Sequence, residues 1–319
     1  MPELPRRALG DSGIEVPIVG IGCNNFGGRT DAGPSERVIL AALEHGVGFF
    51  DTADIYSQGR SEEILGRAVG RRRDEAVIAT KFGGEMGSVE RRGGSRRWIA
   101  EAVEGSLRRL GTDHIDLYQH HFFDEHTSQE ETLGALNELV LAGKLRAIGC
   151  SNYDGAQLER AAAISGEHGW ATFVTAQNEY SLLKRGDVER SVTPAARRLG
   201  VGILPYFPLM SGLLSGKYHR GEAPAAGTRL GRDASRAGDL MSDRNFDIVE
   251  ALDGFARARD LTILDVAIGA LASMAQVVSV IAGATTPEQV IANARAGEWT
   301  PSAADLLEID RITLPAAAR

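Results

Sequence analysis

The stretch WIAEAVEGSLRRLGTDHIDLYQHH, residues 98–121, predicts a helix, a turn and a strand in immediate succession. Ser95 can cap the start of the helix, and Gly111 suits the left-handed residue that ends many helices. The run Ile115–His120 then has the length and apolar content of a strand. One apolar face of the helix Trp98–Leu110 is formed by Ile99, Ala102, Val103, Leu107 and Leu110. The helix should therefore pack on the outside of a sheet.

The same alternation of strand and helix runs through the whole chain. Between the candidate strands lie amphipathic segments, and Gly46 and Gly200, like Gly111, follow such segments where a helix would stop. The candidate strands are Ile18–Gly22, Gly48–Phe50, Ala76–Thr80, Ile115–His120, Leu145–Cys150, Phe173–Ala176, Val201–Leu204 and Val277–Ile281. The chain is therefore predicted to consist of βα repeats.

Eight βα units without a Gly-x-Gly-x-x-Gly turn after the first strand favour a closed (β/α)8 TIM barrel, with an open doubly wound sheet as the alternative. The runs Arg7–Leu9 and Glu15–Pro17 flank the turn Gly10–Gly13 and predict a short N-terminal β-hairpin, which could plug the bottom of the barrel. Further helices are expected at the C-terminal end. We expect residues 1–319 to form one domain.

The composition excludes several classes of protein. A net charge of -8 and the absence of aromatic residues between basic ones argue against a nucleic-acid partner. No apolar run is long enough to span a membrane, and the N-terminus lacks a signal-peptide pattern. Cys23 and Cys150 are the only cysteines, too few for a disulfide framework, and packing explains both. We predict that the protein has no metal site and that it is cytoplasmic.

Polar residues recur where the predicted strands end. In a barrel these positions converge on the C-terminal rim, where this fold builds its active sites. The residues concerned are Asp51, Lys81, His121, Ser151, Asn152, Gln177, Asn178 and Tyr206. Taken singly, each is more simply explained as a structural ion pair or a packed side chain, but their shared position favours a functional site.

Asp51, Tyr56, Lys81 and His121 suit proton transfer to a carbonyl oxygen. A buried lysine needs a carboxylate partner, and Asp51 can provide it. The Lys81 cation should bring the pKa of Tyr56 down from about 10 toward neutrality. His121 could donate a hydrogen bond that orients the carbonyl oxygen while Tyr56 protonates it.

Four motifs in order resemble those of the aldo-keto reductases, and the resemblance spans nearly the whole chain. They are Asp51–Tyr56 followed by Ser61 and Glu62, the run Ser106–Gln119 leading to His121, Gly149–Asn152, and Gln177–Tyr180. The resemblance implies a reductase or alcohol dehydrogenase that transfers hydride between nicotinamide and a carbonyl carbon. Asp51, Tyr56, Lys81 and His121 would then be its catalytic tetrad.

The resemblance also implies a set of cofactor contacts. Ser151, Asn152 and Gln177 would hold the nicotinamide carboxamide, Tyr206 would stack on the ring, and Lys217 would meet the phosphates. The remaining implied contacts are Gly22, Cys23, Pro208, Leu209, Ser211, Gly212, Leu214, Gly283, Thr285, Gln289 and Asn293. Spacing within the motif selects His121 over its neighbour His120 for the site.

The sequence departs from the family pattern in the cofactor region. Phe207 stands where relatives often have serine, and Ala282 replaces a frequent proline. Gly283–Gln289 contains no basic residue for the 2′-phosphate of NADP, so Arg229 or Arg295 would have to bind it. NADP is the predicted cofactor, and NAD stays open.

The substrate is predicted only as a class. It should be a small carbonyl compound or sugar bound by Asn24, Phe122 and Phe123, with the loops Asn24–Arg29, Gly83–Gly94, Phe122–Gln129 and His219–Asp243 around it. Self-association is left open. One alternative is a nucleotide-binding regulatory subunit with little turnover, although no added interaction segment is evident. A barrel isomerase or hydrolase is the other, although the rim lacks the metal or carboxylate cluster it would need.

Overall fold

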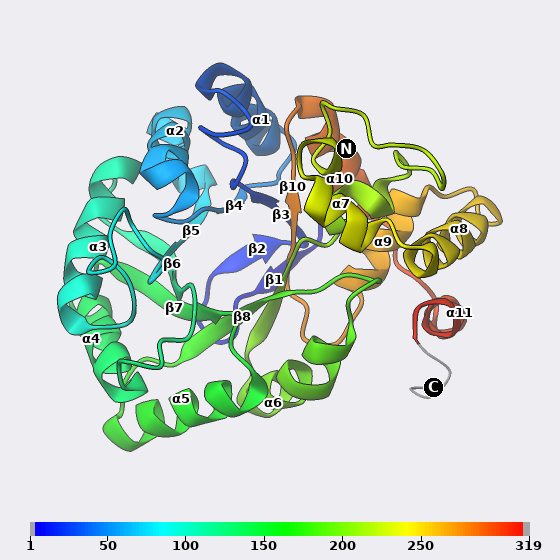
Figure 1. Ribbon diagram of the computed structural model, residues 1–319. Coiled ribbons are helices and arrows are strands. Elements are labelled where there is room, and N and C mark those ends of the chain that lie inside the picture. Colours follow the sequence, from blue (N-terminus) through cyan, green and yellow to red (C-terminus); the bar gives the residue numbers. More distant parts are fainter. Residues whose placement is uncertain (1–3, 315–319) are drawn as a thin grey trace.

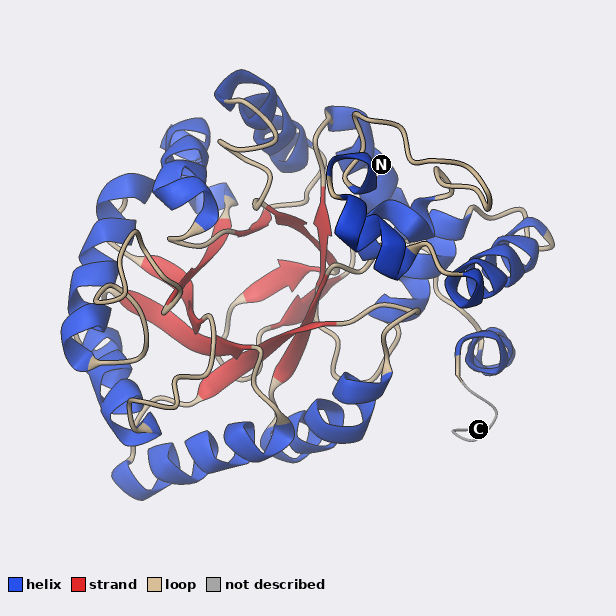
Figure 2. Ribbon diagram, in the orientation of Figure 1, coloured by secondary structure: helices blue, strands red, loops and turns tan. Residues whose placement is uncertain are grey.

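The computed structural model describes residues 4–314, and its centre is a closed barrel of parallel strands surrounded by helices (Figures 1 and 2). The eight strands run in the order β10-β3-β4-β5-β6-β7-β8-β9. They are β3 (Val19–Gly22), β4 (Phe49–Asp51), β5 (Val77–Phe82), β6 (Ile115–His120), β7 (Leu145–Ser151), β8 (Phe173–Glu179), β9 (Gly202–Tyr206) and β10 (Val280–Gly283). The predicted (β/α)8 barrel is confirmed, and the open sheet is excluded.

Helices connect the strands on the outside of the barrel. They are α1 (Ala32–Glu44), α2 (Arg60–Val69), α3 (Arg96–Leu110), α4 (Gln129–Leu141), α5 (Gly155–His168), α6 (Thr193–Leu199), α7 (Ala234–Leu240), α8 (Asp243–Arg257), α9 (Ile263–Ala272), α10 (Pro287–Ala296) and α11 (Ala303–Thr313). Helices α7 and α8 lie within the long β9-to-α9 connection, and α11 is the extra C-terminal helix (Figure 1).

The unit around residues 98–121 forms as its sequence predicts. The Ser95 hydroxyl accepts a hydrogen bond from the Trp98 N–H at 3.3 Å and caps α3. Gly111 ends the helix with a φ of 65°, in the left-handed region that favours glycine. Helix α3 then buries its apolar face, and β6 begins at Ile115.

Most of the predicted strands end too early along the chain. Asp51, Lys81, Ser151, Gln177 and Tyr206 are still strand residues, because the backbone ladder continues through them. Apolar runs were the basis of the predicted ends, and these polar side chains interrupt them. The last strand shows the largest shift, since it begins at Val280 instead of Val277 and continues to Gly283.

The N-terminal hairpin closes the bottom of the barrel, as expected. It consists of β1 (Arg6–Ala8) and β2 (Glu15–Pro17). Strand β1 is shifted by one residue from the predicted run Arg7–Leu9, and β2 has the predicted bounds. Gly10 in its turn has a φ of 52°, and a Cβ there would lie 3.0 Å from the Val174 carbonyl oxygen. The barrel interior is packed with Leu9, Ile14, Val16, Phe49, Ala79, Leu117, Ala147, Val174, Leu204 and Ile281. The chemistry is therefore left to the opposite rim.

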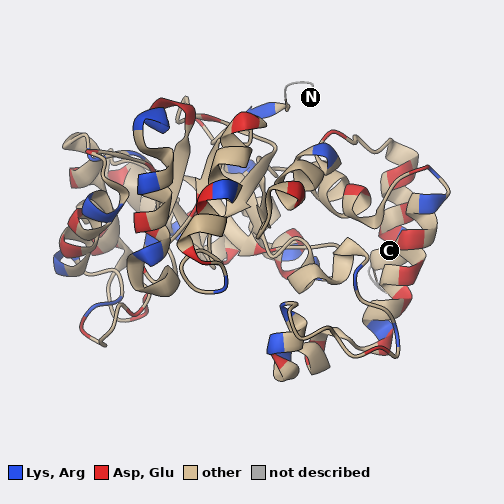
Figure 3. Ribbon diagram, turned by 90° about the horizontal axis from the view of Figure 1, so that it is seen from above, with Lys and Arg blue, Asp and Glu red and all other residues tan. Residues whose placement is uncertain are grey.

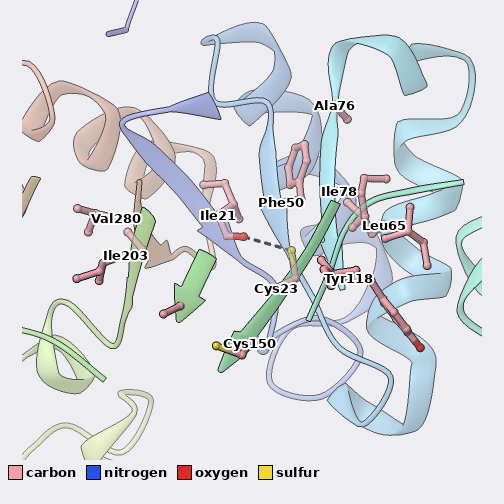
Figure 4. Close-up of a cluster of buried hydrophobic side chains, with 14 of the residues drawn as sticks. Ile21, Cys23, Phe50, Leu65, Ala76, Ile78, Tyr118, Cys150, Ile203 and Val280 are labelled. Atoms are coloured by element: carbon pink, nitrogen blue, oxygen red, sulfur yellow. Dashed lines mark hydrogen bonds between the residues drawn. The ribbon is translucent and has the colours of Figure 1, made fainter. Parts of the chain in front are cut away.

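The main core lies between the sheet and the helices, and both cysteines belong to it (Figure 4). Cys23 and Cys150 are fully buried free thiols, and the Cys23 thiol donates to the Ile21 carbonyl oxygen at 3.5 Å. Burial raises the pKa of each thiol. Neither is therefore placed as a reactive thiolate.

Basic and acidic residues are interspersed along the helices (Figure 3). Several form surface ion pairs, such as Arg220 with Asp243, Asp247 and Glu250 of α8. Within residues 4–314, no helix has the length and apolarity needed to cross a membrane.

Candidate active site

Asp51, Tyr56, Lys81 and His121, here called the tetrad, meet at the C-terminal rim of neighbouring strands. Lys81 extends from β5, and its Nζ lies 2.7 Å from Asp51 Oδ2, 2.8 Å from the Thr52 carbonyl oxygen and 3.3 Å from Tyr56 Oη. The His121 ring stands edge-on to the Tyr56 ring, with 5.9 Å between centroids. The structure thus brings together all four predicted residues.

Two glutamines complete the surroundings of Asp51. Gln119 of β6 and Gln177 of β8 donate to Asp51 Oδ1 at 3.2 Å and 2.8 Å. With Lys81 Nζ on Oδ2, the buried Asp51 carboxylate has three hydrogen-bond donors. Sequence reasoning had not assigned Gln119 to the site, although its alternation with His120 along β6 turns it toward the barrel axis.

The turn that carries Tyr56 is strained but well anchored. Ser57 and Gln58 have φ values of 51° and 54°, an uncommon backbone region for side-chain-bearing residues. The Ser57 hydroxyl donates to the Phe26 carbonyl oxygen at 3.1 Å, and the Tyr56 N–H donates to the Ala53 carbonyl oxygen. Such strain persists only where surrounding contacts over-determine the conformation, and it clusters at functional sites.

Burial controls the protonation of Tyr56 more than its lysine neighbour does. Burial raises the pKa of Tyr56, and the positive charge of Lys81 opposes that rise without reversing it. The prediction of a tyrosine shifted toward neutrality was therefore wrong, because it ignored the desolvation of the phenolate. Burial also lowers the pKa of Lys81, but the charges of Asp51 and Tyr56 outweigh it and raise that pKa overall. At neutral pH Lys81 is therefore an ammonium and Tyr56 a neutral phenol.

His121 is a neutral imidazole in this setting. Burial, followed by the charges of Lys81 and His120, lowers its pKa well below the usual value. Its ring stacks on Phe122 at 4.4 Å, and the buried Nδ1 has no hydrogen-bond partner among the described residues. His120 points instead into the helix layer, where Nδ1 lies 2.8 Å from Tyr153 Oη. The choice of His121 over His120 agrees with this geometry.

A cavity of about 640 Å³ opens above the tetrad. Most of the residues predicted to contact cofactor line it. They are Gly22, Ser151, Asn152, Gln177, Tyr206, Pro208, Leu209, Ser211, Gly212, Lys217, Gly283, Thr285, Gln289 and Asn293. Asn24 and Phe122, predicted for substrate, also line it, as do Asp51, Tyr56 and His121.

Three predicted contacts do not line the cavity. The Cys23 side chain turns into the core, where it is fully buried. Leu214 is fully buried in a second apolar cluster with residues of α8 and α9. Phe123 packs against Tyr153, with ring centroids 5.4 Å apart. A motif identifies the segment that passes the site, but the direction of each side chain depends on local backbone geometry.

Asn152 links His121 to Tyr206. Its Nδ2 donates to the His121 carbonyl oxygen at 2.9 Å, and its Oδ1 accepts from the Tyr206 hydroxyl at 2.7 Å. Asn152 adopts a φ of 59°, which asparagine tolerates better than most residues. These bonds orient the Tyr206 ring at the wall of the cavity.

Arginines that the sequence did not place together gather around Phe207. The guanidinium carbons of Arg229 and Arg236 each lie 4.6 Å from the Phe207 ring centroid, and Arg236 Nε donates to the Ser211 hydroxyl at 2.8 Å. Arg29 lines the same cavity. Burial, followed by the charges of Arg29 and Arg236, lowers the pKa of Arg229 to about 10. Phe207 thus holds two cations at the rim.

The arginine cluster, meaning Arg29, Arg229 and Arg236, has no carboxylate within ion-pair distance in the described part of the chain. Lys217 likewise has no carboxylate within ion-pair distance among the described residues. Its Nζ packs against Gly212 and lies 5.1 Å from the Tyr218 ring centroid. Arg29, Arg229 and Lys217 line the same cavity, and uncompensated cations there suit an anionic ligand.

The opposite wall comes from β10 and α10. Thr286 caps α10, and Gln289 Oε1 accepts from the Thr285 N–H at 2.8 Å. Asn293 is buried, and its Nδ2 has no hydrogen-bond partner among residues 4–314. Arg295 is exposed and does not line the cavity. Of the two basic residues predicted for the 2′-phosphate, only Arg229 lines the cavity.

No group of three or more His, Cys, Asp and Glu side chains is arranged to hold a metal ion in the described ranges. Lys81 Nζ is hydrogen-bonded to both Asp51 and Tyr56, and this geometry suits transfer of a proton from Tyr56.

Comparison with known proteins agrees with this architecture. The family model for the aldo/keto reductase family matches residues 18–313. The aldo-keto reductase YhdN of Bacillus subtilis (strain 168) is 34% identical over 313 residues, covering 96% of this chain and 92% of the relative. The L-glyceraldehyde 3-phosphate reductase of Escherichia coli O157:H7 is 30% identical over 327 aligned residues, covering 97% and 92%.

A relative with a different role is equally well covered. The probable voltage-gated potassium channel subunit beta of Oryza sativa subsp. japonica is 33% identical over 312 residues, covering 95% of each chain. The barrel, the convergent rim residues and the match over residues 18–313 lead to one conclusion. The chain belongs to the aldo/keto reductase family of oxidoreductases.

Proposed function

We propose that the protein interconverts a carbonyl compound, either an aldehyde, a ketone or an aldose, and the corresponding alcohol, using NADP. The observation that carries this proposal is the buried Lys81 Nζ bound to both Asp51 and Tyr56, which line the cavity. A phenol with a lysine hydrogen bond behind it can release a proton and have the resulting phenolate stabilised.

In the direction of reduction, Tyr56 donates its proton to the carbonyl oxygen of the substrate. The Lys81 ammonium stabilises the phenolate that remains, and Asp51 keeps that ammonium charged and oriented. The neutral His121 can donate a hydrogen bond to the same oxygen without competing for the proton. In oxidation, Tyr56 takes the proton back as the general base. Nicotinamide, when bound, would supply or accept the hydride at the carbonyl carbon.

The residues of the cavity fit a nicotinamide dinucleotide. Tyr206 presents a flat ring fixed by Asn152, and the buried Asn293 amide has an unused donor. Ser211, Gly212 and Lys217 offer polar groups and a cation to a pyrophosphate. The assignment of individual contacts is part of the proposal.

The arginine cluster favours NADP over NAD. A pyrophosphate carries two negative charges near neutrality, and Lys217 and Arg236 lie beside the segment that would bind it. Arg29 and Arg229 then remain for a further phosphate, which NADP has and NAD lacks. They would replace the basic residues missing from Gly283–Gln289.

Replacing Tyr56 by Phe tests the mechanism. We expect reduction of a panel of aldehydes, ketones and aldoses to fall by about 10²–10⁴-fold, because the proton donor is gone while the ring volume stays. Binding of NADPH, measured by fluorescence titration, should change little. Full turnover in Tyr56→Phe would overturn the assigned role, and wild-type protein without turnover on any carbonyl would overturn the function.

A second candidate is a nucleotide-binding subunit with little turnover. The match to proteins named as potassium channel beta subunits favours it. The tetrad is complete, which favours the enzyme. The two are separated by the same assay, since a subunit of this kind would bind NADPH tightly and turn over slowly even with its best substrate.

A further inference from the structure

A second group of ionisable side chains lies buried behind the tetrad, on the helix side of the barrel wall. Asp54, two residues before Tyr56, is 1% exposed, and neither of its carboxylate oxygens has a hydrogen-bond partner within the described chain. Glu62 of α2 is fully buried in the same layer. A buried carboxylate without donors is costly to ionise, so Asp54 calls for an explanation.

The neighbouring charges do not compensate Asp54. Glu62 already uses its two oxygens, which accept from Thr80 Oγ1 and from Arg109 Nε of α3 at 2.6 Å each. Lys81 of β5 is paired with Asp51. Tyr118 of β6 is a neutral phenol, because burial and then the charges of Asp54 and Glu62 raise its pKa. The Arg109 guanidinium therefore faces two carboxyl groups, those of Asp54 and Glu62.

This cluster is joined to the turn that carries Tyr56. The Asp54 N–H donates to the Lys81 carbonyl oxygen at 3.1 Å, which ties the start of the turn to β5. At its other end Gly59, with a φ of 88°, lies directly against Arg109, since a Cβ there would be 2.5 Å from Arg109 Cδ. Residues Asp54–Gly59, the catalytic turn, thus rest on the cluster at both ends.

We propose that Asp54 is a positioning residue of the catalytic turn: its carboxyl group carries a proton in the active conformation, and loss of that proton beside Glu62 displaces the turn and Tyr56 with it. The inference rests on the proposed function in assigning Tyr56 to proton transfer. An ionised Asp54 would be repelled by Glu62 and attracted toward water. Ser57 and Gln58 hold positive φ values, so a displacement that let them leave this region would release backbone strain.

The proton balance agrees with this role. Burial, followed by the charge of Glu62, raises the pKa of Asp54 to about 7. The Ile55 N–H, which is near the carboxylate but outside hydrogen-bond geometry, and the charges of Arg109 and Lys81 oppose that rise. The side chain therefore changes charge in the physiological range, whereas Tyr56, with its raised pKa, remains a phenol there. A fall in turnover around neutrality would then report Asp54 and not the proton donor.

Nuclear magnetic resonance tests the displacement without any assay of turnover. With 13C at the phenol carbon of tyrosine, the Tyr56 signal is identified by its loss in Tyr56→Phe, and the Asp54 carboxyl signal by its loss in Asp54→Asn. We expect both signals to shift with one midpoint near neutrality, and the Tyr56 signal to stop shifting in Asp54→Asn. An Asp54 midpoint below about pH 5, or a Tyr56 signal that does not follow it, would overturn the proposal.

Two further variants keep the test decisive. In Glu62→Gln the repelling charge is gone, so the shared midpoint should move to lower pH in a protein whose Asp54 is unchanged. Asp116→Asn is the matched control, because Asp116 is equally buried but paired with Arg73 and Arg146 at the start of β6. It should leave the midpoint in place. A midpoint unmoved in Glu62→Gln contradicts the proposal.

Turnover separates this inference from the proposed function. About one pH unit above the midpoint roughly nine-tenths of Asp54 is ionised, so carbonyl reduction by the wild type should fall to about a tenth of that by Asp54→Asn. Parallel profiles of the two proteins would overturn the positioning role. Absence of reduction at every pH would instead overturn the proposed function, and the resonance experiment would still decide the behaviour of Asp54.

Discussion

Lys81 is the residue on which the proposed chemistry of the rim depends. Its ammonium is fully buried, and Asp51, Tyr56 and the Thr52 carbonyl oxygen all bind it. Burial alone would discharge a lysine, but the carboxylate keeps it positive. A positive Lys81 in turn opposes the upward shift that burial imposes on the pKa of Tyr56.

Breaking the buried ion pair between Lys81 and Asp51 should reduce both the stability and the activity of the protein. In Lys81→Met the Asp51 carboxylate stays buried with only Gln119 and Gln177 as donors, so we expect a loss of about 3–5 kcal/mol of unfolding free energy. Turnover should fall by about 10²–10⁴-fold. Urea denaturation and a carbonyl reduction assay measure the two effects.

The double variant Asp51→Asn with Lys81→Met is the control for the buried charge. It removes both charges, so most of the lost stability should return while turnover stays low. Recovery of turnover together with stability would show that Lys81 acts only by holding the fold.

Arg229 should decide the preference between the two nucleotides. A charge-assisted bond to a phosphate contributes about 1.5–3 kcal/mol, so Arg229→Ala should weaken NADPH binding by roughly 10- to 150-fold and NADH binding much less. Arg295→Ala is the matched control, because Arg295 is exposed outside the cavity. Equal losses for both nucleotides would place Arg229 at the pyrophosphate instead.

At the scale of elements, close packing of neighbouring helices positions the strand ends. Helix α2 follows the catalytic turn, and α3 follows β5, so their contact helps to hold the Tyr56 and Lys81 segments together. Gly66 of α2 lies against the backbone of Leu110 at the end of α3, where a Cβ would come within 2.2 Å of the carbonyl oxygen. Only glycine allows this approach.

Gly66→Ala should therefore destabilise the protein although alanine is the better helix former. The clash with backbone atoms cannot be relieved by a rotamer change, and we expect a loss of about 1–3 kcal/mol, as for other overpacked sites. Gly166→Ala in α5 is the matched control, because nothing lies within 4 Å of its added Cβ. That variant should gain about 0.5–1 kcal/mol, from helix propensity alone. Thermal or urea unfolding that ranks the two variants in the opposite order would contradict the packing argument.

At the scale of the whole molecule, buried histidines should make the protein sensitive to acid. Burial lowers the pKa of His120 to about 4, so the folded state takes up this proton later than the unfolded chain does. The stabilising contribution is complete above a pH of about 6.5 and is lost as the pH falls toward about 4. Its full size is on the order of 3 kcal/mol.

His120→Gln should flatten the decline in unfolding free energy over this range, as measured by urea denaturation at several pH values. His168→Gln is the control for removal of a histidine, because His168 is partly exposed whereas His120 is buried. Asp54 acts with the opposite sign, since its raised pKa makes stability fall as the pH rises toward 7. Comparison with Asp54→Asn separates the two contributions. An unchanged slope in His120→Gln would exclude His120 as the acid-sensitive group.

The order and type of most barrel elements could be predicted because they depend on local patterns. Helical periodicity, the cap at Ser95 and the turn at Gly111 act within a few residues, and each formed as predicted. The strand ends were harder to predict, because Lys81 and Gln177 continue the ladder although they break the apolar run. Whether a polar residue can stay in a strand depends on partners from other strands.

The sequence by itself determined the repeating βα plan, the bottom hairpin and the tetrad, because periodicity and motif spacing are properties of the chain alone. Only the tertiary structure decided the raised pKa of Tyr56, the inward turn of Cys23 and the gathering of arginines on Phe207. Desolvation, side-chain direction and cation–π contact each depend on groups distant in sequence. Asp54 is the clearest case, since burial and then the charge of Glu62 from α2 raise its pKa to about 7, against the charges of Arg109 from α3 and Lys81 from β5.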